Sequence, residues 1–157
     1  MTISTITGNK KILFHRLLVC ISLIWLGMIL GISFLGAPLG FMVPGPKFET
    51  GLGIGREVFA VFNRIECAMA ITMAILIVIV RQKDRRVISL VVVWSSLALQ
   101  TFWLLPILFD RVELILQGQQ PPSSLAHLFY VYLEIAKAVA LAVYGFRKIG
   151  KRDVRDI

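Results

Sequence analysis

The sequence is poor in the residues from which metal centres and cofactor-free catalytic sites are usually built. It has two cysteines, two histidines and nine acidic residues among 157. Cys20 and Cys67 each lie inside an apolar run, without a CxxC or Cys/His spacing. The pattern therefore does not indicate a zinc site or a disulfide framework, and both thiols are expected to pack as small apolar groups. No nucleophile–base pair and no phosphate-binding loop is visible, which disfavours an autonomous enzyme.

Long apolar runs are abundant. Hydrophobic residues make up 57% of the chain, and the mean hydropathy is +0.82. A soluble domain of this length could not bury so much apolar surface. Four runs of about 22 to 24 residues could each cross a hydrocarbon core of ~30 Å as a helix, at ~1.5 Å per residue: 12–35, 58–80, 87–108 and 125–146. The predicted fold class is therefore all-α, a single integral membrane domain (residues 1–157) that forms a four-transmembrane-helix bundle and ends in a basic tail, 147–157.

The distribution of charge predicts the orientation of this bundle. Seventeen Lys and Arg residues against nine Asp and Glu give a formal net charge of +8. Twelve basic residues fall in the N-terminal segment, the loop 81–86 and the tail, whereas three fall in the other two loops. The positive-inside rule then places both termini on the cytoplasmic side, at the inner membrane if the protein is bacterial. The expected partners are the lipid bilayer and other membrane subunits. Nucleic acid is not expected, because no soluble basic domain remains to bind a duplex.

The loops and glycines add further expectations. The short loop 81–86 predicts a tight antiparallel hairpin of the second and third helices. The first outer loop, Gly36–Gly55, is rich in Gly and Pro and is predicted to be irregular. Gly27 and Gly31, four residues apart in the first run, would permit close approach of another helix.

The fourth run carries a polar stripe. His127, Tyr130, Glu134, Lys137 and Tyr144 recur at spacings of three, four, three and seven, which places them on one helical face. Glu134 and Lys137 fall near mid-bilayer, where each charged side chain costs about 2.5–3.5 kcal/mol to insert. This helix is therefore expected to insert well only if its polar stripe finds partners inside the bundle.

Polar residues of the second and third runs fall at a similar depth, by helix rise. We therefore predict a buried polar layer in which Arg64 or Lys137 neutralises Glu134 and Glu66 supplies a second carboxylate. The layer comprises Arg64, Glu66, Gln100, Tyr130, Glu134 and Lys137. It could fix the helix register as a salt-bridge network, form a polar pathway or ion site, or dock another membrane subunit. Ionisable groups within a membrane frequently mark proton relays and ligand sites.

His15 and His127 are the candidate haem or metal ligands. They fall near opposite membrane boundaries, more than ~20 Å apart in depth by helix rise, which argues against a shared bis-His site. A single-His site is favoured at His127, because it joins the polar stripe. The alternatives are an interfacial anchor beside Arg16 for His15, and an interfacial or helix-start hydrogen-bonding residue for His127. The sequence predicts no cofactor, and haem is the one that its histidines leave open.

Three stretches together resemble a known family of small membrane proteins. They are Trp25-Leu26-Gly27 running to Gly36-Ala37-Pro38-Leu39-Gly40-Phe41, Gly55-Arg56-Glu57-Val58-Phe59 through Asn63-Arg64-Ile65-Glu66, and the polar stripe of the fourth run. The pattern resembles the transmembrane-protein-205-like family, a domain of unknown function, and is more distantly similar to the copper-resistance protein D and HemJ membrane proteins. The resemblance covers most of residues 12–146 and implies the four-helix fold. HemJ-like relatives imply a haem-associated oxidoreductase in which His15 is the matching histidine, and copper-resistance relatives imply metal handling. The chain lacks the further His and Met clusters expected for either activity.

Three functional interpretations follow. The leading one is a non-catalytic accessory or scaffolding subunit of a larger membrane assembly. The first alternative is a small transporter or a proton- or metal-handling protein that uses the Glu, Lys and Arg residues of the polar layer. The second alternative is a haem-binding membrane oxidoreductase that uses His15 or His127.

Overall fold

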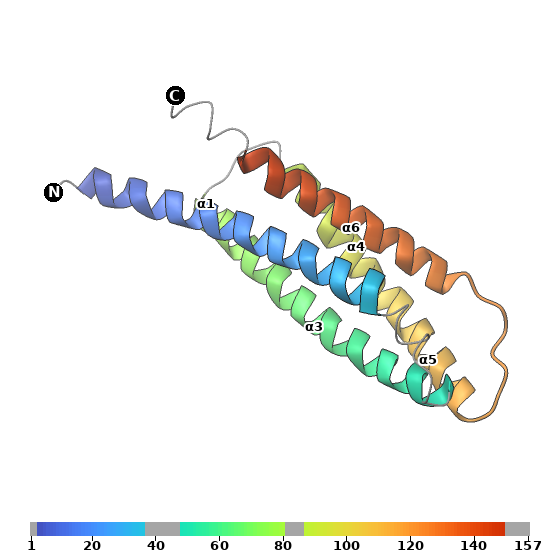
Figure 1. Cartoon of the computed structure of the whole chain (residues 1–157). Helices are drawn as coiled ribbons and strands as arrows, with labels where there is room; N and C mark the ends of the chain where they lie inside the picture. Colours follow the sequence, from blue (N-terminus) through green and yellow to red (C-terminus); the bar gives the residue numbers. More distant parts are fainter. Residues whose placement is uncertain (1–2, 37–47, 81–86, 150–157) are drawn as a thin grey trace.

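The structure, a computed structural model, describes residues 3–36, 48–80 and 87–149, and this part of the chain is a bundle of long helices without strands (Figure 1). The elements in chain order are α1 (Ile3–Met28), the π-helical η1 (Ile29–Gly36), α3 (Phe48–Val80), α4 (Val87–Leu99), the π-helical η2 (Gln100–Leu104), α5 (Leu105–Leu116) and α6 (Ala126–Ile149). Four stretches are long and apolar enough to cross a membrane: Ile12–Gly36, Thr50–Val80, Ile88–Leu116 and Ala126–Phe146. The chain therefore has the architecture of a multi-pass membrane protein, as predicted.

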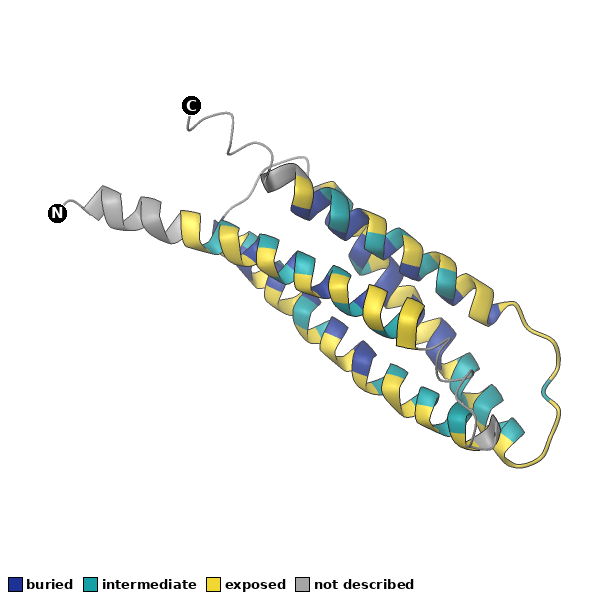
Figure 2. Cartoon of the chain, in the orientation of Figure 1, coloured by how far each residue is buried: buried dark blue, intermediate teal, exposed yellow. Residues whose placement is uncertain are grey.

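The surface of the bundle is apolar, as a lipid environment requires. Large side chains such as Val78 and Phe102 are 74% and 83% exposed, and exposed residues follow the outward faces of the helices (Figure 2). In water this surface would be unfavourable, but lipid tails solvate it. The helical backbone satisfies its own hydrogen bonds, which is the other condition for crossing a bilayer.

Helix α6 occupies the central position in the packing. It packs mainly against α4 and α1, α1 in turn packs against α3, and α5 contacts α3 (Figure 1). The second and third spans therefore contact each other only in part, in contrast to the predicted tight hairpin. In the third span, α4 packs mainly on α6, and α5, which follows α4 and η2, contacts α3 more than α4 does. The loop 81–86 lies outside the described residues. The start of α1 and the end of α6 share one end of the bundle, and we call the opposite end the α5–α6 end (Figure 1).

Helix α3 begins ten residues before the predicted second span. The expectation of an irregular loop is wrong for residues 48–55, because Gly51, Gly53 and Gly55 lie in regular helix. A helical glycine costs about 1 kcal/mol relative to alanine. Within or near a membrane, however, an unpaired backbone group costs more than that, so the helix continues through the glycines. Residues 37–47 of the same loop lie outside the described part.

The third span changes its helical form ahead of Pro106. Proline lacks an N–H group, and its ring clashes with the carbonyl group four residues earlier. The chain widens into the π-helical η2, where the backbone N–H of Leu105 donates to the carbonyl oxygen of Gln100. Helix α5 then runs to Leu116, and Gly118, two residues later, has a φ of 74°, the left-handed conformation that often follows a helix C-terminus.

Helices α1 and α6 approach each other closely at Gly145 of α6. A Cβ atom on Gly145 would meet Cδ2 of Leu23 on α1 at 2.8 Å. By contrast, a Cβ atom on Gly27 or Gly31 would meet nothing within 4 Å, so no described helix of this chain approaches these two glycines closely, and approach by a helix of another molecule stays a prediction. Gly31 instead borders an open space that is described below.

Candidate functional site

The centre of the bundle holds a cluster of charged side chains that come from two helices. The Nζ atom of Lys137 on α6 lies 2.5 Å from Oε1 of Glu66 on α3 and 3.0 Å from Oε1 of Glu134 on α6. The Glu66 and Lys137 side chains are 0% exposed, and that of Glu134 is 1% exposed. The predicted buried Glu–Lys ion pair is therefore present, and it joins α3 to α6 within the membrane-spanning part of the chain.

Two further side chains hold the carboxylates in place. Nε1 of Trp25 on α1 donates to Oε1 of Glu66 at 2.8 Å. Nε2 of Gln100 donates to Oε1 of Glu134 at 3.0 Å and to the backbone oxygen of Tyr130 at 3.2 Å. The cluster therefore draws on all four spans, and each span contributes a side chain to its hydrogen bonds or ion pairs.

Several buried polar atoms of this cluster remain without a hydrogen bond within the described residues. They are Oε2 of Glu66, Oε2 of Glu134, Oε1 of Gln100 and the hydroxyl oxygen of Tyr130. A buried oxygen without a partner is costly and is one signature of a site that takes up a proton, a water molecule or an ion. The second oxygen of each carboxyl group is therefore the atom available for such chemistry.

Arg64 does not join the cluster, and this part of the predicted layer is wrong. Its side chain is exposed, whereas Glu66, two residues further along α3, is buried. Two residues correspond to a rotation of about 200° around an α-helix, so these side chains cannot both face the core. The five other predicted residues, Glu66, Gln100, Tyr130, Glu134 and Lys137, are all buried. Two carboxyl groups consequently share a single ammonium group.

Trp25 was not predicted from the sequence as a member of the site. The available signal was its indole N–H, because a buried tryptophan usually finds a hydrogen-bond acceptor. A second polar contact was also missed. Nδ2 of Asn63 on α3 donates to the Thr101 hydroxyl group on η2 at 2.9 Å, which ties the second span to the third beside Gln100.

Both π-helical segments lie next to the site. Gln100, which binds Glu134, is the first residue of η2, and η1 contributes Gly31, Ile32 and Gly36 to a nearby cavity. A π-helical turn re-aims side chains relative to a regular helix and is found frequently at functional sites. In this chain η2 accommodates Pro106 and turns Gln100 towards α6.

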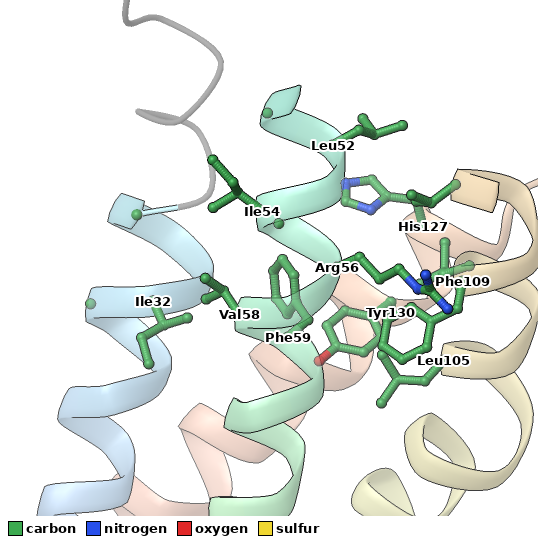
Figure 3. Close-up of a pocket in the computed structure, with 16 residues that line it drawn as sticks. Ile32, Leu52, Ile54, Arg56, Val58, Phe59, Leu105, Phe109, His127 and Tyr130 are labelled. Carbon is green, nitrogen blue, oxygen red and sulfur yellow. The ribbon is translucent and has the colours of Figure 1, made fainter. Parts of the chain in front are cut away.

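An apolar cavity of about 580 Å³ lies at the α5–α6 end of the bundle, between η1, α3, α5 and α6 (Figure 3). Tyr130 connects this cavity to the charged cluster. Its ring lines the cavity and packs edge-on against Phe59, with ring centroids 5.7 Å apart. It also precedes Glu134 by one helical turn on the same face of α6. The cavity therefore reaches to within one turn of the buried carboxylates.

The two histidines lie far from each other along the bundle. His127, at the first turn of α6, is exposed and borders the cavity, whereas His15 lies in the half of α1 nearer the termini and is partly buried. Within the described residues, no group of three or more His, Cys, Asp and Glu side chains could hold a metal ion. Haem or metal binding by either histidine remains a prediction.

Comparison with protein-family models, with curated proteins and with solved structures gives no match for this chain. The resemblance noted from the sequence therefore remains a proposal.

Proposed function

We propose that this chain is a small proton-handling membrane protein, in which Glu66 and Glu134 share one proton and Lys137 is the fixed counter-charge. The observation that supports the proposal is the charge count of the cluster. Two fully buried carboxyl groups contact one ammonium group, and each keeps one oxygen without a hydrogen bond within the described residues.

The charge count favours one bound proton at rest. With both carboxyl groups ionised, the cluster would carry a net negative charge in a medium of low dielectric constant, which is strongly unfavourable. One proton shared by the pair makes the cluster neutral. The Nζ atom of Lys137 contacts Glu66 on α3 and Glu134 on α6. Loss or gain of the proton would therefore change how strongly Lys137 is attracted to Glu66 compared with Glu134.

The cavity offers a route for proton exchange from the α5–α6 end. Tyr130 separates the cavity from Glu134, and its hydroxyl group can both donate and accept a hydrogen bond. In this arrangement a proton would enter through the cavity, pass the Tyr130 hydroxyl group and reach the carboxyl pair. A proton-coupled transporter requires such a site with access from one side.

Infrared spectroscopy of the protein in lipid tests the bound proton directly. At neutral pH we expect the C=O stretch of a protonated carboxylic acid, which should disappear in Glu66→Gln, in Glu134→Gln or in both. Glu113→Gln is the matched control, because Glu113 is exposed and pairs with Arg56 at the bundle end. Absence of the band in the wild-type protein would overturn the proposal.

Proton flux into liposomes tests the function. A pH-sensitive dye inside the vesicles should report faster acidification with the wild-type chain than with the double variant Glu66→Gln and Glu134→Gln. Asp110→Asn, at an exposed residue that does not line the cavity, should match the wild type. Equal flux from the wild type and the double variant would reject a role in proton movement, even if the infrared band is present.

The accessory-subunit and haem-binding interpretations are the competing proposals. Isolation from native membranes distinguishes them. A partner present in stoichiometric amount would favour the accessory role, and a Soret absorption band that is lost on substitution of His15 or His127 would favour haem binding.

A further inference from the structure

The apolar cavity differs in character from the charged cluster and has features of a ligand site. Its volume of about 580 Å³ lies within the range of small-molecule sites in proteins, about 300–1,000 Å³. The lining is apolar apart from Arg56, His127 and Tyr130. Glycines at positions 31, 36, 51 and 55 leave room where side chains would otherwise fill the space. The lining therefore suits a molecule that is mostly apolar.

A groove on the side of the bundle adjoins the cavity. This second hollow, of about 330 Å³, lies between η1 and α3 and shares Ile32 and Val58 with the cavity. Both hollows are bordered by residues of the apolar stretches that can cross a membrane, and Val58 is 44% exposed. An occupant can consequently reach the cavity from the lipid phase, without passing through water.

Among the described residues that line the cavity, Arg56 is the one that carries a formal positive charge. Its guanidinium group lies 5.6 Å from the centre of the Phe109 ring, and Nη1 lies 3.3 Å from Oε2 of Glu113 (Figure 3). The Arg56 side chain is 35% exposed, so it is partly withdrawn from solvent. A guanidinium group has five N–H donors, and a single contact to Glu113 leaves others for a second anion.

From these features we propose that the cavity binds a single-chain anionic amphiphile of the long-chain fatty acid class. The acyl chain occupies the apolar cavity after lateral passage between η1 and α3, and the carboxylate binds the guanidinium group of Arg56. One chain suits the cavity volume, and the guanidinium group of Arg56 at its border suits one anionic head. Binding of the acyl chain does not require proton handling by the buried cluster, but it would occupy the cavity through which the proposed proton route runs.

Photo-crosslinking in lipid nanodiscs tests this site. The probe is palmitic acid with a diazirine group on its chain, and mass spectrometry of the labelled peptides locates the chain. We expect labelling of η1, α3 and α5 residues that line the cavity. Arg56→Gln should lower labelling by about tenfold or more, because it removes a charge-assisted hydrogen bond. Arg64→Gln, a change at an exposed arginine of the same helix, should have no effect.

Two further variants keep the proposal testable if Arg56→Gln misfolds. Glu113→Gln should increase labelling, because it removes the anion that competes for Arg56. Gly55→Leu should block labelling by filling the cavity, and a Cβ atom at this glycine meets nothing within 4 Å, so the helices need not move.

Neutral and two-chain probes identify the occupant. The methyl ester of the same diazirine fatty acid, and a phosphatidylcholine with a diazirine on one chain, should label the cavity weakly. If either probe labels it as strongly as the free acid, and Arg56→Gln leaves labelling unchanged, the cavity holds ordinary bilayer lipid and the proposal is wrong.

Discussion

The Nζ atom of Lys137 and the Oε1 atom of Glu66 lie 2.5 Å apart, although 71 residues separate them in the sequence. Neither side chain is exposed. The same Glu66 oxygen accepts the indole N–H of Trp25, so a single atom connects α1, α3 and α6. The relative position of three of the four spans is thereby tied to one carboxylate.

Substitution of Lys137 should be among the most destabilising single changes in this bundle. Lys137→Met keeps much of the side-chain volume but leaves Glu66 and Glu134 without their ammonium group. Breaking a buried ion pair by removal of one partner typically costs about 3–5 kcal/mol. The loss can be measured by thermal or SDS-induced unfolding of the purified protein in detergent.

The control for this change is Arg64→Met, which also removes a cation from a membrane-spanning helix. Arg64 is exposed on a membrane-spanning helix, where a charge is itself unfavourable, so its loss should not destabilise the bundle and can stabilise it. Equal destabilisation by the two variants would show that Lys137 does not depend on its buried partners.

The hydrogen bond from Trp25 can be tested without loss of the aromatic packing. Trp25→Phe removes the indole N–H that donates to Glu66 while it retains a ring in the core. A hydrogen bond to a charged group contributes about 1.5–3 kcal/mol, and we expect the lower end, because Lys137 still occupies the same oxygen. Trp94→Phe, at a half-buried tryptophan, provides the comparison. A loss no larger than that of Trp94→Phe in the same unfolding assay would contradict this role.

The spans and most of the charged cluster could be predicted from the sequence because their physical signals are local. Runs of apolar residues indicate the helices, and the three- and four-residue spacings of the fourth run place Tyr130, Glu134 and Lys137 on one face. The depth of a residue in the membrane follows from helix rise. This estimate correctly predicted that Glu66 and Gln100 lie at the level of Glu134.

Rotation about each helix axis was harder to predict. Arg64 and Glu66 have nearly the same depth, yet one is exposed and the other is buried. Depth alone does not distinguish them, and an apolar helix that faces lipid has too weak a polar face to indicate its rotation. The cavity was unpredictable for a related reason, because it results from helix packing around Gly31 and Gly55 and not from any motif.

Gly145 is predicted to be intolerant of larger side chains. Its Cβ position lies 2.8 Å from Leu23, so Gly145→Leu should force α6 away from α1 and cost about 1–3 kcal/mol or more through overpacking. Gly27→Leu is the matched control, because Gly27 is exposed and a Cβ atom there meets nothing within 4 Å. The control should be neutral or stabilising, since leucine favours helix over glycine. If the two substitutions have the same effect on unfolding, the close approach of α1 and α6 is not important for stability.

The orientation of the bundle is predicted by its basic residues and can be tested by cysteine labelling. In a background in which Cys20 and Cys67 are replaced by alanine, Gln119→Cys lies in the exposed connection between α5 and α6. A membrane-impermeant maleimide added to intact cells should label it, because this end carries few Lys and Arg residues and is predicted to face outward. A cysteine at position 157, in the basic tail, should react only after the membrane is permeabilised. Labelling of position 157 in intact cells, with protection of position 119, would reverse the orientation and place the proposed proton route and the fatty acid site at the cytoplasmic side.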